Sequence, residues 1–285
     1  MKHLQTLALL ARQPGVLVTV EQVQGSGPRE QGAWMAVFAD TVVNTIGGGH
    51  LEFQALAQAR AWLARGDATS APQRLRYALG PALGQCCGGV VHVLLEWITL
   101  ADAPRLREQL CPPLLPVALF GGGHVGRALV QTLAALPFAV RWIDSRDEIF
   151  PEPVPAHVVC EHSDPVQSAV ADLPPHSAVL IMSFSHAEDL DVVAACLKRQ
   201  RVQGDVSFIG LIGSRTKWAT FRHRLASRGF SDDELARVTC PIGVPGITGK
   251  EPEVIAVAVA AQLLQWRDSH AQDGAHLLAP GRQQG

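Results

Sequence analysis

The sequence predicts an α/β protein in which an amino-terminal α/β domain precedes a domain built on a doubly wound parallel sheet. A chain of 285 residues is long enough for two domains, each with a core of its own. From Leu115 onward, short apolar runs alternate with helix-spaced segments, as parallel strands joined by crossover helices require. The first of these runs breaks into glycines and then resumes with helical spacing, which is typical of a phosphate-binding turn.

Composition and charge exclude several classes of function. Charged residues make up 18% of the chain and the formal net charge is -2, so no basic surface for nucleic acid or an anionic membrane is indicated. No apolar run approaches the roughly 18 residues of a membrane span, and the apolar opening is too short for a signal peptide. The six cysteines lack the spacing of a small disulfide scaffold or a zinc site, which suits a reducing cytoplasm. We therefore expect a cytoplasmic protein whose partner is a small molecule or a protein.

The amino-terminal domain is expected to span residues 1–105. It opens with a helix, and the residue pattern predicts strands at 16–20 and 33–38. The glycine-rich loop between these strands presents Arg29. An arginine framed by glycines can hold a phosphate or carboxylate or remain a solvated loop charge, and the sequence favours neither interpretation.

A further strand, a glycine turn and a helix follow, with the helix expected at 51–65. Gly48 and Gly49 belong to a run of three glycines that lacks the third spaced glycine of a dinucleotide fingerprint. The turn is either a backbone nest for a planar or anionic ligand, with His50 and Glu52 beside it, or a structural turn that needs positive φ. Taken alone, the pattern favours the structural turn, and a lone histidine is more often a hydrogen-bonded structural residue.

Two adjacent cysteines, Cys86 and Cys87, stand before Gly88 and Gly89 and a predicted strand at 90–97. Adjacent cysteines rarely form a relaxed disulfide with each other. The glycines leave both sulfurs accessible and offer amides that lower a thiol pKa, which favours a thiolate that binds a soft metal or carries sulfur. The alternative is a pair of small buried apolar side chains.

Prolines and charges at 101–115 predict a connector with few hydrogen bonds, and so a domain boundary. The second domain is expected at 115–267. Its tail, 268–285, shows little apolar periodicity and is predicted to be disordered.

The glycine turn of the second domain carries the spacing of a dinucleotide fingerprint. Gly121 would make the tight turn, Gly123 would allow close approach of a pyrophosphate, and Gly126 would let helix and strand pack. The next strand ends at Asp144, about 20 residues further on, where a carboxylate would bind a ribose hydroxyl and repel a 2′-phosphate. Arg146 weakens that preference for NAD over NADP because it lies close enough to compensate. These features predict a Rossmann-like domain.

Further strands of this domain are predicted at 116–120, 139–143, 158–160, 178–182 and 208–212. Polar residues follow three of them, namely Asp144, Ser145 and Arg146, then Ser183, Ser185, His186 and Asp189, then Ser214, Arg215 and Lys217. Because ligands bind beyond the carboxyl ends of parallel strands, these groups are candidates for one cleft. For Asp189 the favoured interpretation is an acid that only stabilises a helix start.

A glycine-proline loop at 240–250 leads into the last predicted helix, 251–266. Pro252 suits its first turn. Lys250 stands beside that helix start, where a phosphate would meet both backbone amides and an ammonium group.

Several motifs, taken in order, resemble the XdhC/CoxI family of xanthine dehydrogenase accessory proteins. They are Gly25-Ser26-x-Pro28-Arg29, Thr45-Ile46-Gly47-Gly48-Gly49-His50-Leu51-Glu52, Leu83-Gly84-Gln85-Cys86-Cys87-Gly88-Gly89, Phe120-Gly-Gly-Gly-His-Val-Gly126, Gly210-Leu211-Ile212-Gly213-Ser214 and Pro241-Ile242-Gly243. The match covers nearly the whole chain, and the double-cysteine motif indicates the xanthine dehydrogenase branch, XdhC. One departure from the family pattern is Phe184, where related sequences often carry a histidine. This chain therefore has His186 without the second histidine of the pair.

The resemblance implies a maturation factor of purine catabolism rather than an enzyme. Such a chaperone binds the molybdenum cofactor (molybdopterin), keeps it while a cysteine desulfurase supplies the terminal sulfur ligand, and inserts it into the molybdenum-binding subunit of apo-xanthine dehydrogenase. Cys87 falls on the cysteine of the family pattern, so it is the first candidate for contact with the molybdenum, and Cys86 is the second.

Two alternatives remain open at this stage, an NAD(P)-dependent oxidoreductase and a persulfide carrier that uses both cysteines. The glycine fingerprint would hold either NAD(P) or the pterin phosphate, and the oligomeric state is open, with a homodimer among the alternatives. The motifs and the resemblance together give these candidate cofactor-binding residues: Arg29, Gly48, Gly49, His50, Glu52, Cys86, Cys87, Gly88, Gly89, Gly121, Gly123, His124, Gly126, Asp144, His186, Ser214 and Lys250.

Overall fold

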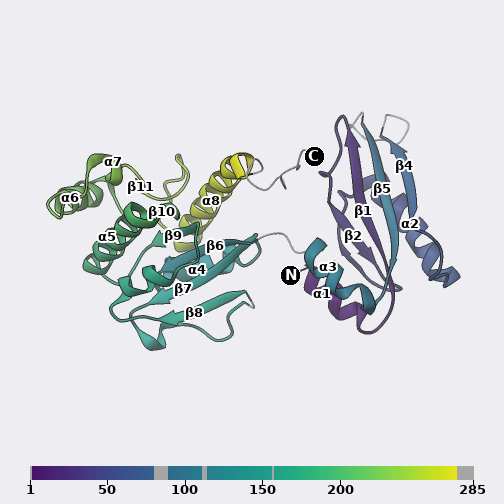
Figure 1. Cartoon of the computed structure of the whole chain (residues 1–285), viewed down its shortest axis with the longest axis horizontal. Helices are drawn as coiled ribbons and strands as arrows, with labels where there is room; N and C mark the ends of the chain where they lie inside the picture. Colours follow the sequence, from purple (N-terminus) through teal and green to yellow (C-terminus); the bar gives the residue numbers. More distant parts are fainter. Residues whose placement is uncertain (1, 80–88, 111–113, 156, 275–285) are drawn as a thin grey trace, which may run out of the picture. The chain divides into compact units, whose positions relative to one another are not determined.

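The computed structural model describes residues 2–79, 89–110, 114–155 and 157–274. Contacts divide the chain into an amino-terminal unit, Met1–Pro112, and a carboxy-terminal unit, Pro113–Gly285 (Figure 1). Each unit contains one sheet and its own buried clusters of apolar side chains. The predicted α/β class is therefore confirmed.

The amino-terminal unit is built on an antiparallel sheet with the strand order β3-β2-β1-β5-β4. Its strands are β1 (Gly15–Gln24), β2 (Trp34–Val37), β3 (Val42–Asn44), β4 (Gln73–Ala78) and β5 (Val90–Ile98). Alternation along β1 and β5 turns Val18 and Val93 toward one face and Leu17 and Ile98 toward the other. Both faces of this sheet therefore carry apolar side chains that need cover.

Helices cover the two faces of this sheet. The helix α2 (Gly49–Arg65) packs Ala55, Ala59 and Trp62 into the cluster on one face. On the other face, α1 (Lys2–Leu10) and α3 (Ala103–Leu110) bury leucines against Leu17 and Ile98. The unit is a three-layer α/β domain.

The two units divide at Pro112/Pro113, within the predicted boundary region 101–115, but part of that region is helical and not a connector with few hydrogen bonds. A 3-10 turn, η2 (Leu100–Asp102), leads into α3, and Leu106 and Leu110 are buried in the amino-terminal unit. Thr99 and Asp102 form a reciprocal capping box at the start of this segment. Pro104 does not interrupt the helix because proline is tolerated in a first turn, where amide donors have no partner within the helix.

The carboxy-terminal unit contains a six-stranded sheet in which every pairing is parallel. Its strands are β6 (Leu115–Phe120), β7 (Phe138–Asp144), β8 (Val158–His162), β9 (Ser177–Ile181), β10 (Val206–Leu211) and β11 (Val238–Thr239). Numbered along the chain, they lie in the order 3-2-1-4-5-6, which is the order of dinucleotide-binding sheets. The strand order reverses between β6 and β9, and ligands of such sheets bind at that point.

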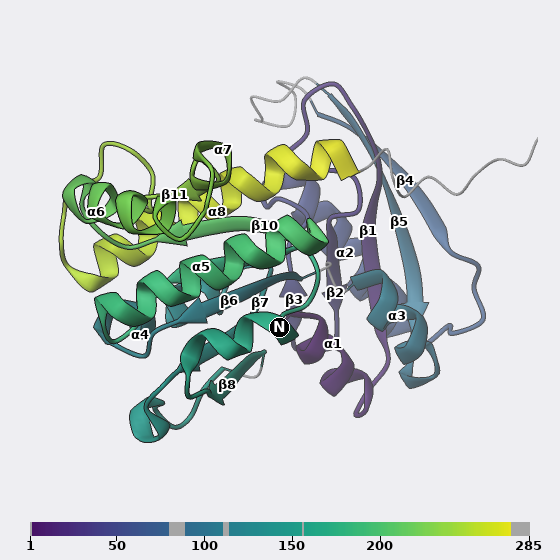
Figure 2. The same cartoon turned by 60° about the vertical axis from the view of Figure 1, so that its left-hand side comes forward.

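Helices cover both faces of the parallel sheet (Figure 2). One face is covered by α4 (His124–Leu133) and α8 (Pro252–Gly274). The other face is covered by η4 (Val166–Asp172), α5 (His186–Gln203), α6 (Arg215–Ala226) and α7 (Asp232–Leu235). A further 3-10 turn, η3 (Asp147–Ile149), follows β7. The five strands predicted for this domain and its doubly wound architecture are confirmed.

The last helix is longer than the sequence predicted. α8 continues to Gly274, so 268–274 is helical and not disordered, while 275–285 lies outside the described residues. Ala256, Val259 and Leu263 pack this helix against the sheet, and extending a formed helix by a further turn costs little until a glycine weakens it. No helix in the described part of the chain has the length and apolarity to cross a bilayer.

One buried arginine fastens α5 to the neighbouring segments. The side chain of Arg199 is 7% exposed and forms two hydrogen bonds with the Asp205 carboxylate, at 2.8 and 2.6 Å. Its guanidinium also donates to the carbonyl oxygens of Val170 and Leu173, at 2.7 and 2.8 Å. The buried guanidinium is thus hydrogen-bonded on several sides at once, which the three donors of a lysine ammonium group cannot reproduce.

Replacing Arg199 with Ala is expected to lower the free energy of unfolding by about 3 kcal/mol, since the Asp205 carboxylate and the carbonyls of Val170, Ala171 and Leu173 lose the hydrogen bonds of the guanidinium. Urea unfolding of the whole chain measures the effect. Arg222→Ala, which breaks an exposed ion pair with Asp232, is the control and should cost about 1 kcal/mol or less. Equal losses from both substitutions would contradict the role assigned to Arg199.

Candidate functional site

The glycine turn lies between β6 and α4, where the strand order reverses. Gly121 has φ +125, and a Cβ there would come within 2.0 Å of the Met182 carbonyl oxygen. A Cβ on Gly126 would come within 2.0 Å of the Gly121 oxygen, so neither position accepts a side chain. A Cβ on Gly123 would have no neighbour within 4 Å. The first and third glycines therefore serve the packing of the turn, whereas the second leaves open space over it.

Asp144 is tied to this turn, and its carboxylate is 1% exposed. Its Oδ2 accepts from the Gly122 amide at 2.5 Å and from Arg146 Nη2 at 2.9 Å. Its Oδ1 accepts from the Arg146 amide at 2.9 Å and from Nε at 2.8 Å. Burial alone would raise the pKa of Asp144, but the hydrogen bonds from Arg146 and Gly122 outweigh it and lower the pKa.

This geometry corrects the expectation of a free carboxylate at Asp144. Both oxygens already accept hydrogen bonds, because Arg146 folds back onto the carboxylate two residues before it. Asp144 therefore orients the turn and neutralises Arg146, and it does not present an unpaired negative charge that would repel a phosphate.

Arg146 and Ser145 connect the end of β7 to the segment after β9. The Arg146 guanidinium carbon lies 4.4 Å from the ring centroid of Phe184, whose side chain is 65% exposed. Ser145 Oγ donates to Glu188 Oε1 at 2.7 Å, and the Phe184 amide donates to Glu188 Oε2 at 3.1 Å. Since β6 lies between β7 and β9, these contacts join the strands on either side of the glycine turn.

A buried ion pair continues the network from α5 to α6. Lys217 Nζ lies 2.6 Å from Asp189 Oδ2 and donates to the Ile212 oxygen at 2.8 Å. The other Asp189 oxygen accepts from the Ser183 amide at 2.8 Å. The favoured interpretation of Asp189 as a helix-start acid is thus incomplete, because its side chain binds Lys217 and the β9 segment. The polar residues that follow β7, β9 and β10 therefore lie together at the carboxyl edge of the sheet, as the sequence predicted.

Cys240 stands at the same edge and is a residue that sequence reasoning did not single out as reactive. Burial raises the pKa of its thiol to about 11, and the nearby charge of Lys217 opposes this only in part. The thiol is therefore protonated near neutral pH, which disfavours a role as nucleophile or metal ligand.

The remaining candidates of this unit lie at helix starts. His124 and His186 are the exposed first residues of α4 and α5, and Ser214 caps α6 by accepting from the Lys217 amide at 3.1 Å. The His186 ring packs edge-on against Phe221, with centroids 6.3 Å apart. Lys250 is exposed before α8 and forms no hydrogen bond or ion pair with the described residues.

Three loops of the amino-terminal unit meet at one end of its sheet. A Cβ on Gly89 would lie 2.4 Å from the Ser26 carbonyl oxygen, and one on Gly47 would lie 2.6 Å from Pro28 Cβ. The strand β5 begins directly after Gly89, and the Leu79 amide donates to the Gly89 oxygen at 2.7 Å. Residues 79 and 89, which flank the cysteine segment, are thus held beside the arginine loop. Cys86, Cys87 and Gly88 themselves lie outside the described residues.

The glycine turn before α2 is held by Glu52. One oxygen of this carboxylate accepts from the Ile46 amide at 2.9 Å, from the Gly48 amide at 3.1 Å and from the Thr45 hydroxyl. Gly48 and Gly49 have φ +72 and +65, as the structural interpretation of the turn requires. Glu52 therefore serves the turn, although a Cβ on Gly48 would meet nothing within 4 Å.

Arg29 and His50 have local partners. Arg29 forms an ion pair with Glu30 at 2.9 Å and donates to the Thr45 oxygen at 3.5 Å. The guanidinium lowers the pKa of Glu30 to about 2. His50 Nε2 lies 2.7 Å from the side-chain nitrogen of Gln54. Within the ranges that the structure describes, no three His, Cys, Asp or Glu side chains gather as metal ligands.

Comparisons with known proteins cover both units. Residues 117–263 match the family model described as the XdhC Rossmann domain, and residues 8–78 match that of the XdhC and CoxI family. The uncharacterized protein YqeB of Escherichia coli K12 is 29% identical over 261 residues, which is 90% of this chain. The matched region is 44% of YqeB, so the chain spans less than half the length of that relative.

A solved structure shares the fold of nearly the whole chain. It is a crystal structure from Bacillus halodurans described as a xanthine dehydrogenase, with a TM-score of 0.76 and 21% identity. The match covers 94% of this chain and 96% of that one.

Replacing Asp144 with Asn is expected to lower the free energy of unfolding by about 2 kcal/mol near neutral pH, a typical value for hydrogen bonds to a charged group. Because folding lowers the pKa of Asp144, its stabilisation is present above the ordinary carboxyl pKa of 3.8 and is lost as the pH falls through the folded value. Urea unfolding from about pH 7 to about pH 3 should therefore show the two proteins converging in acid.

The control for this titration is Asp147→Asn, which changes an exposed carboxylate three residues away and should follow the wild type at every pH. A stability difference between Asp144→Asn and wild type that stays constant down to the acid end would contradict the account of Asp144.

Proposed function

The chain belongs to the XdhC and CoxI family, and from this premise we propose that it is an accessory protein of xanthine dehydrogenase that carries the molybdenum cofactor. In this proposal it holds molybdopterin-bound molybdenum while a cysteine desulfurase supplies the terminal sulfur. It then inserts the cofactor into the molybdenum-binding subunit of the apo-enzyme. Its own role is binding and protection, without turnover of a substrate.

The single observation that carries the proposal furthest is the open space over Gly123. The cofactor ends in a phosphate, and a phosphate binds where backbone amides at a helix start are accessible. No side chain caps the first turn of α4, and a Cβ on Gly123 would meet nothing within 4 Å. The residues present therefore fit the phosphate of the cofactor, with the Gly123 and His124 amides as its donors.

The sulfur-binding part of the proposal rests on the cysteine segment. Cys87, and after it Cys86, would supply the soft ligand that molybdenum favours. Leu79 and Gly89, the described residues on either side of this segment, lie at the end of the sheet where Arg29 and the Gly48 turn lie, and Gly89 is beside Gly25. When bound, the cofactor supplies the molybdenum and dithiolene that the acceptor enzyme needs.

A second candidate for the glycine turn is NAD(P), favoured by the 3-2-1-4-5-6 strand order. The NAD preference expected from Asp144 loses its basis, because Arg146 neutralises that carboxylate. A nucleotide at this turn would thus meet a guanidinium that accommodates a 2′-phosphate as well as a ribose. Titration of the cofactor-free protein with NAD, NADP and the pterin distinguishes the two candidates.

Replacing Gly123 with Ala is expected to leave folding intact, because its φ of -69 suits alanine and its Cβ meets no neighbour. The added methyl group would occupy the space of the phosphate, so retention of the phosphate ligand should fall about tenfold, or ~1.4 kcal/mol. Calorimetry with the pterin and with each nucleotide measures the change. Gly126→Ala is the contrast and should destabilise the fold itself. Unchanged affinity of Gly123→Ala for every phosphate ligand would remove the turn from the site.

The carrier function is tested by mixing the loaded protein with molybdenum-free apo-xanthine dehydrogenase and measuring dehydrogenase activity. Wild type should activate the apo-enzyme, Cys87→Ser should fail and Cys86→Ser should retain part of the effect, because a hydroxyl is a poor soft ligand. Cys160→Ser is the matched control, since the structure describes that residue as a free cysteine on β8. Equal activation by free sulfurated cofactor with and without this protein would contradict the proposal.

A further inference from the structure

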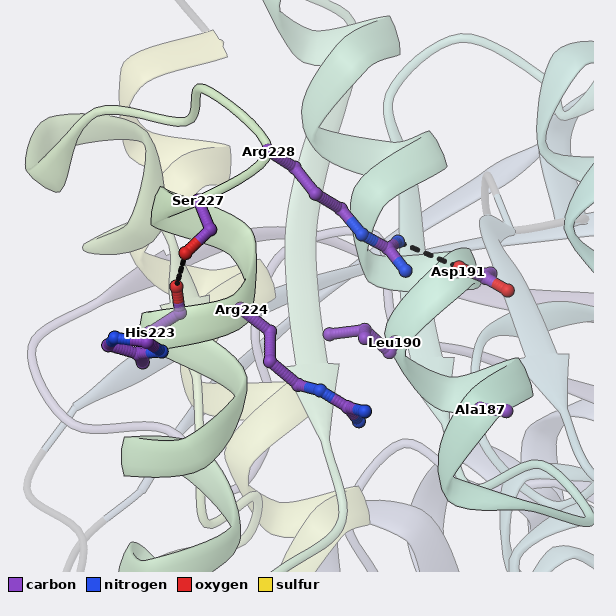
Figure 3. A pocket seen from close by; sticks show the side chains of 7 residues that line it. All are labelled: Ala187, Leu190, Asp191, His223, Arg224, Ser227 and Arg228. Carbon is purple, nitrogen blue, oxygen red and sulfur yellow. Dashed lines mark hydrogen bonds and ion pairs between the residues drawn. The ribbon is translucent and has the colours of Figure 1, made fainter.

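A groove of about 470 Å³ lies between α5 and α6, apart from the glycine turn. Ala187, Leu190 and Asp191 line it from the first turns of α5. His223, Arg224, Ser227 and Arg228 line it from the end of α6 and the residues that follow. Figure 3 shows the side chains of Arg224 and Arg228 extending from the α6 side toward α5, with Leu190 between the two helices and the His223 ring directed away.

The α6 segment carries an unusual concentration of positive charge for a chain with a net charge of -2. Residues 215–228 contain no Asp or Glu and the following cations: Arg215, Lys217, Arg222, Arg224 and Arg228. Lys217 is paired with Asp189, Arg222 with Asp232 and Arg228 with Asp191. Within the described residues, the side chain of Arg224 forms no ion pair or hydrogen bond. Its guanidinium is therefore available to a carboxylate from outside.

The two sides of the groove differ in chemistry. On the α5 side, Ala187 is exposed and offers apolar contact, and Leu190 lies buried at the base of the groove. On the other side, Arg224 is unpaired, and Arg228 lies 2.8 Å from Asp191 with its side chain 47% exposed. A simple anion would use the guanidinium groups but not the apolar contact. An amphipathic segment that places a leucine-like side chain between carboxylates would use both.

We propose that the α5–α6 groove is a docking site for an acidic amphipathic segment of a partner protein. The segment lies between the two helices, its apolar side chain contacts Ala187 above the buried Leu190, and a carboxylate receives two parallel hydrogen bonds from Arg224. A second carboxylate of the segment lies near Arg228 and shares that guanidinium with Asp191. This inference concerns protein recognition and does not depend on cofactor binding.

The position of the groove links docking to the carboxyl edge of the sheet. Lys217 and Asp189 join α6 to α5 within their first turns, and Ala187 and Leu190, which line the groove, lie on either side of Asp189 in α5. A partner segment in the groove would contact both helices of that pair. Recognition of the partner would thus take place on the same helices that frame the candidate ligand site.

The test is fluorescence anisotropy with the full chain and a labelled peptide of leucines and glutamates at helical spacing. Binding is expected to weaken as salt rises, because exposed charges are screened. Arg224→Ala removes the positive charge and should weaken binding about tenfold. Arg224→Glu also reverses the charge and should weaken binding about a hundredfold. Arg60→Glu, the same charge change at an exposed site on α2, is the matched control and should leave the affinity unchanged. Arg224→Lys should bind with intermediate affinity because it keeps the charge but loses the paired donors.

Three results would overturn the proposal. The first is no binding of the wild type at about 1 mM peptide, the limit of weak specific affinity. The second is equal binding by Arg224→Glu and wild type, with thermal unfolding showing both proteins folded. The third is tighter Arg224-dependent binding of inorganic phosphate or of single-stranded DNA than of the peptide, which would assign the groove to phosphate instead of a protein carboxylate.

Discussion

The carboxylate of Asp144 is the group on which the carboxyl edge of the parallel sheet depends. A buried carboxylate is costly unless its oxygens are hydrogen-bonded, and Asp144 meets that requirement through the Gly122 amide and Arg146. The first of these bonds fixes the glycine turn, and the second directs the guanidinium over Phe184. From there Glu188 connects the segment to Ser145. The position of the turn and the position of the α5 start are therefore set by one connected group of contacts.

Much of the carboxy-terminal fold was predictable because its strands are buried on both faces and read as continuous apolar runs. The roles of Gly121 and Gly126 were also predictable, because glycines at the spacing Gly-x-Gly-x-x-Gly are a recognisable sequence motif. The partners of Asp144 and Asp189 were not. Lys217 lies 28 residues beyond Asp189, and Arg146 folds back along its own chain, so neither contact leaves a periodic signal. The sequence shows that a charged residue follows a strand. It does not show which residue pairs with it, because that depends on how the helices pack.

The amino-terminal unit shows the same limits. Its central strands were predictable from β-branched residues, but β4 alternates arginines with Leu75 and Tyr77 and lacked a strong apolar signal. The helix α3 was missed because prolines suggested a connector, although Leu106 and Leu110 have helical spacing. At the Gly48 turn, the hydrogen bonds of Glu52 favour the structural turn over the ligand-binding nest. The cysteine motif lies outside the described residues, so its role stays a prediction.

We propose phosphate recognition at the Gly123 turn and, separately, soft-metal recognition by the cysteine segment. The most direct measurement is the chemical identity of the ligand that co-purifies with the full chain from a molybdenum-replete host, by mass spectrometry and metal analysis. We expect a phosphorylated pterin together with molybdenum in equal amounts. Recovery of NAD or NADP without pterin or molybdenum, or of no ligand from a host whose molybdenum enzymes are loaded, would contradict it.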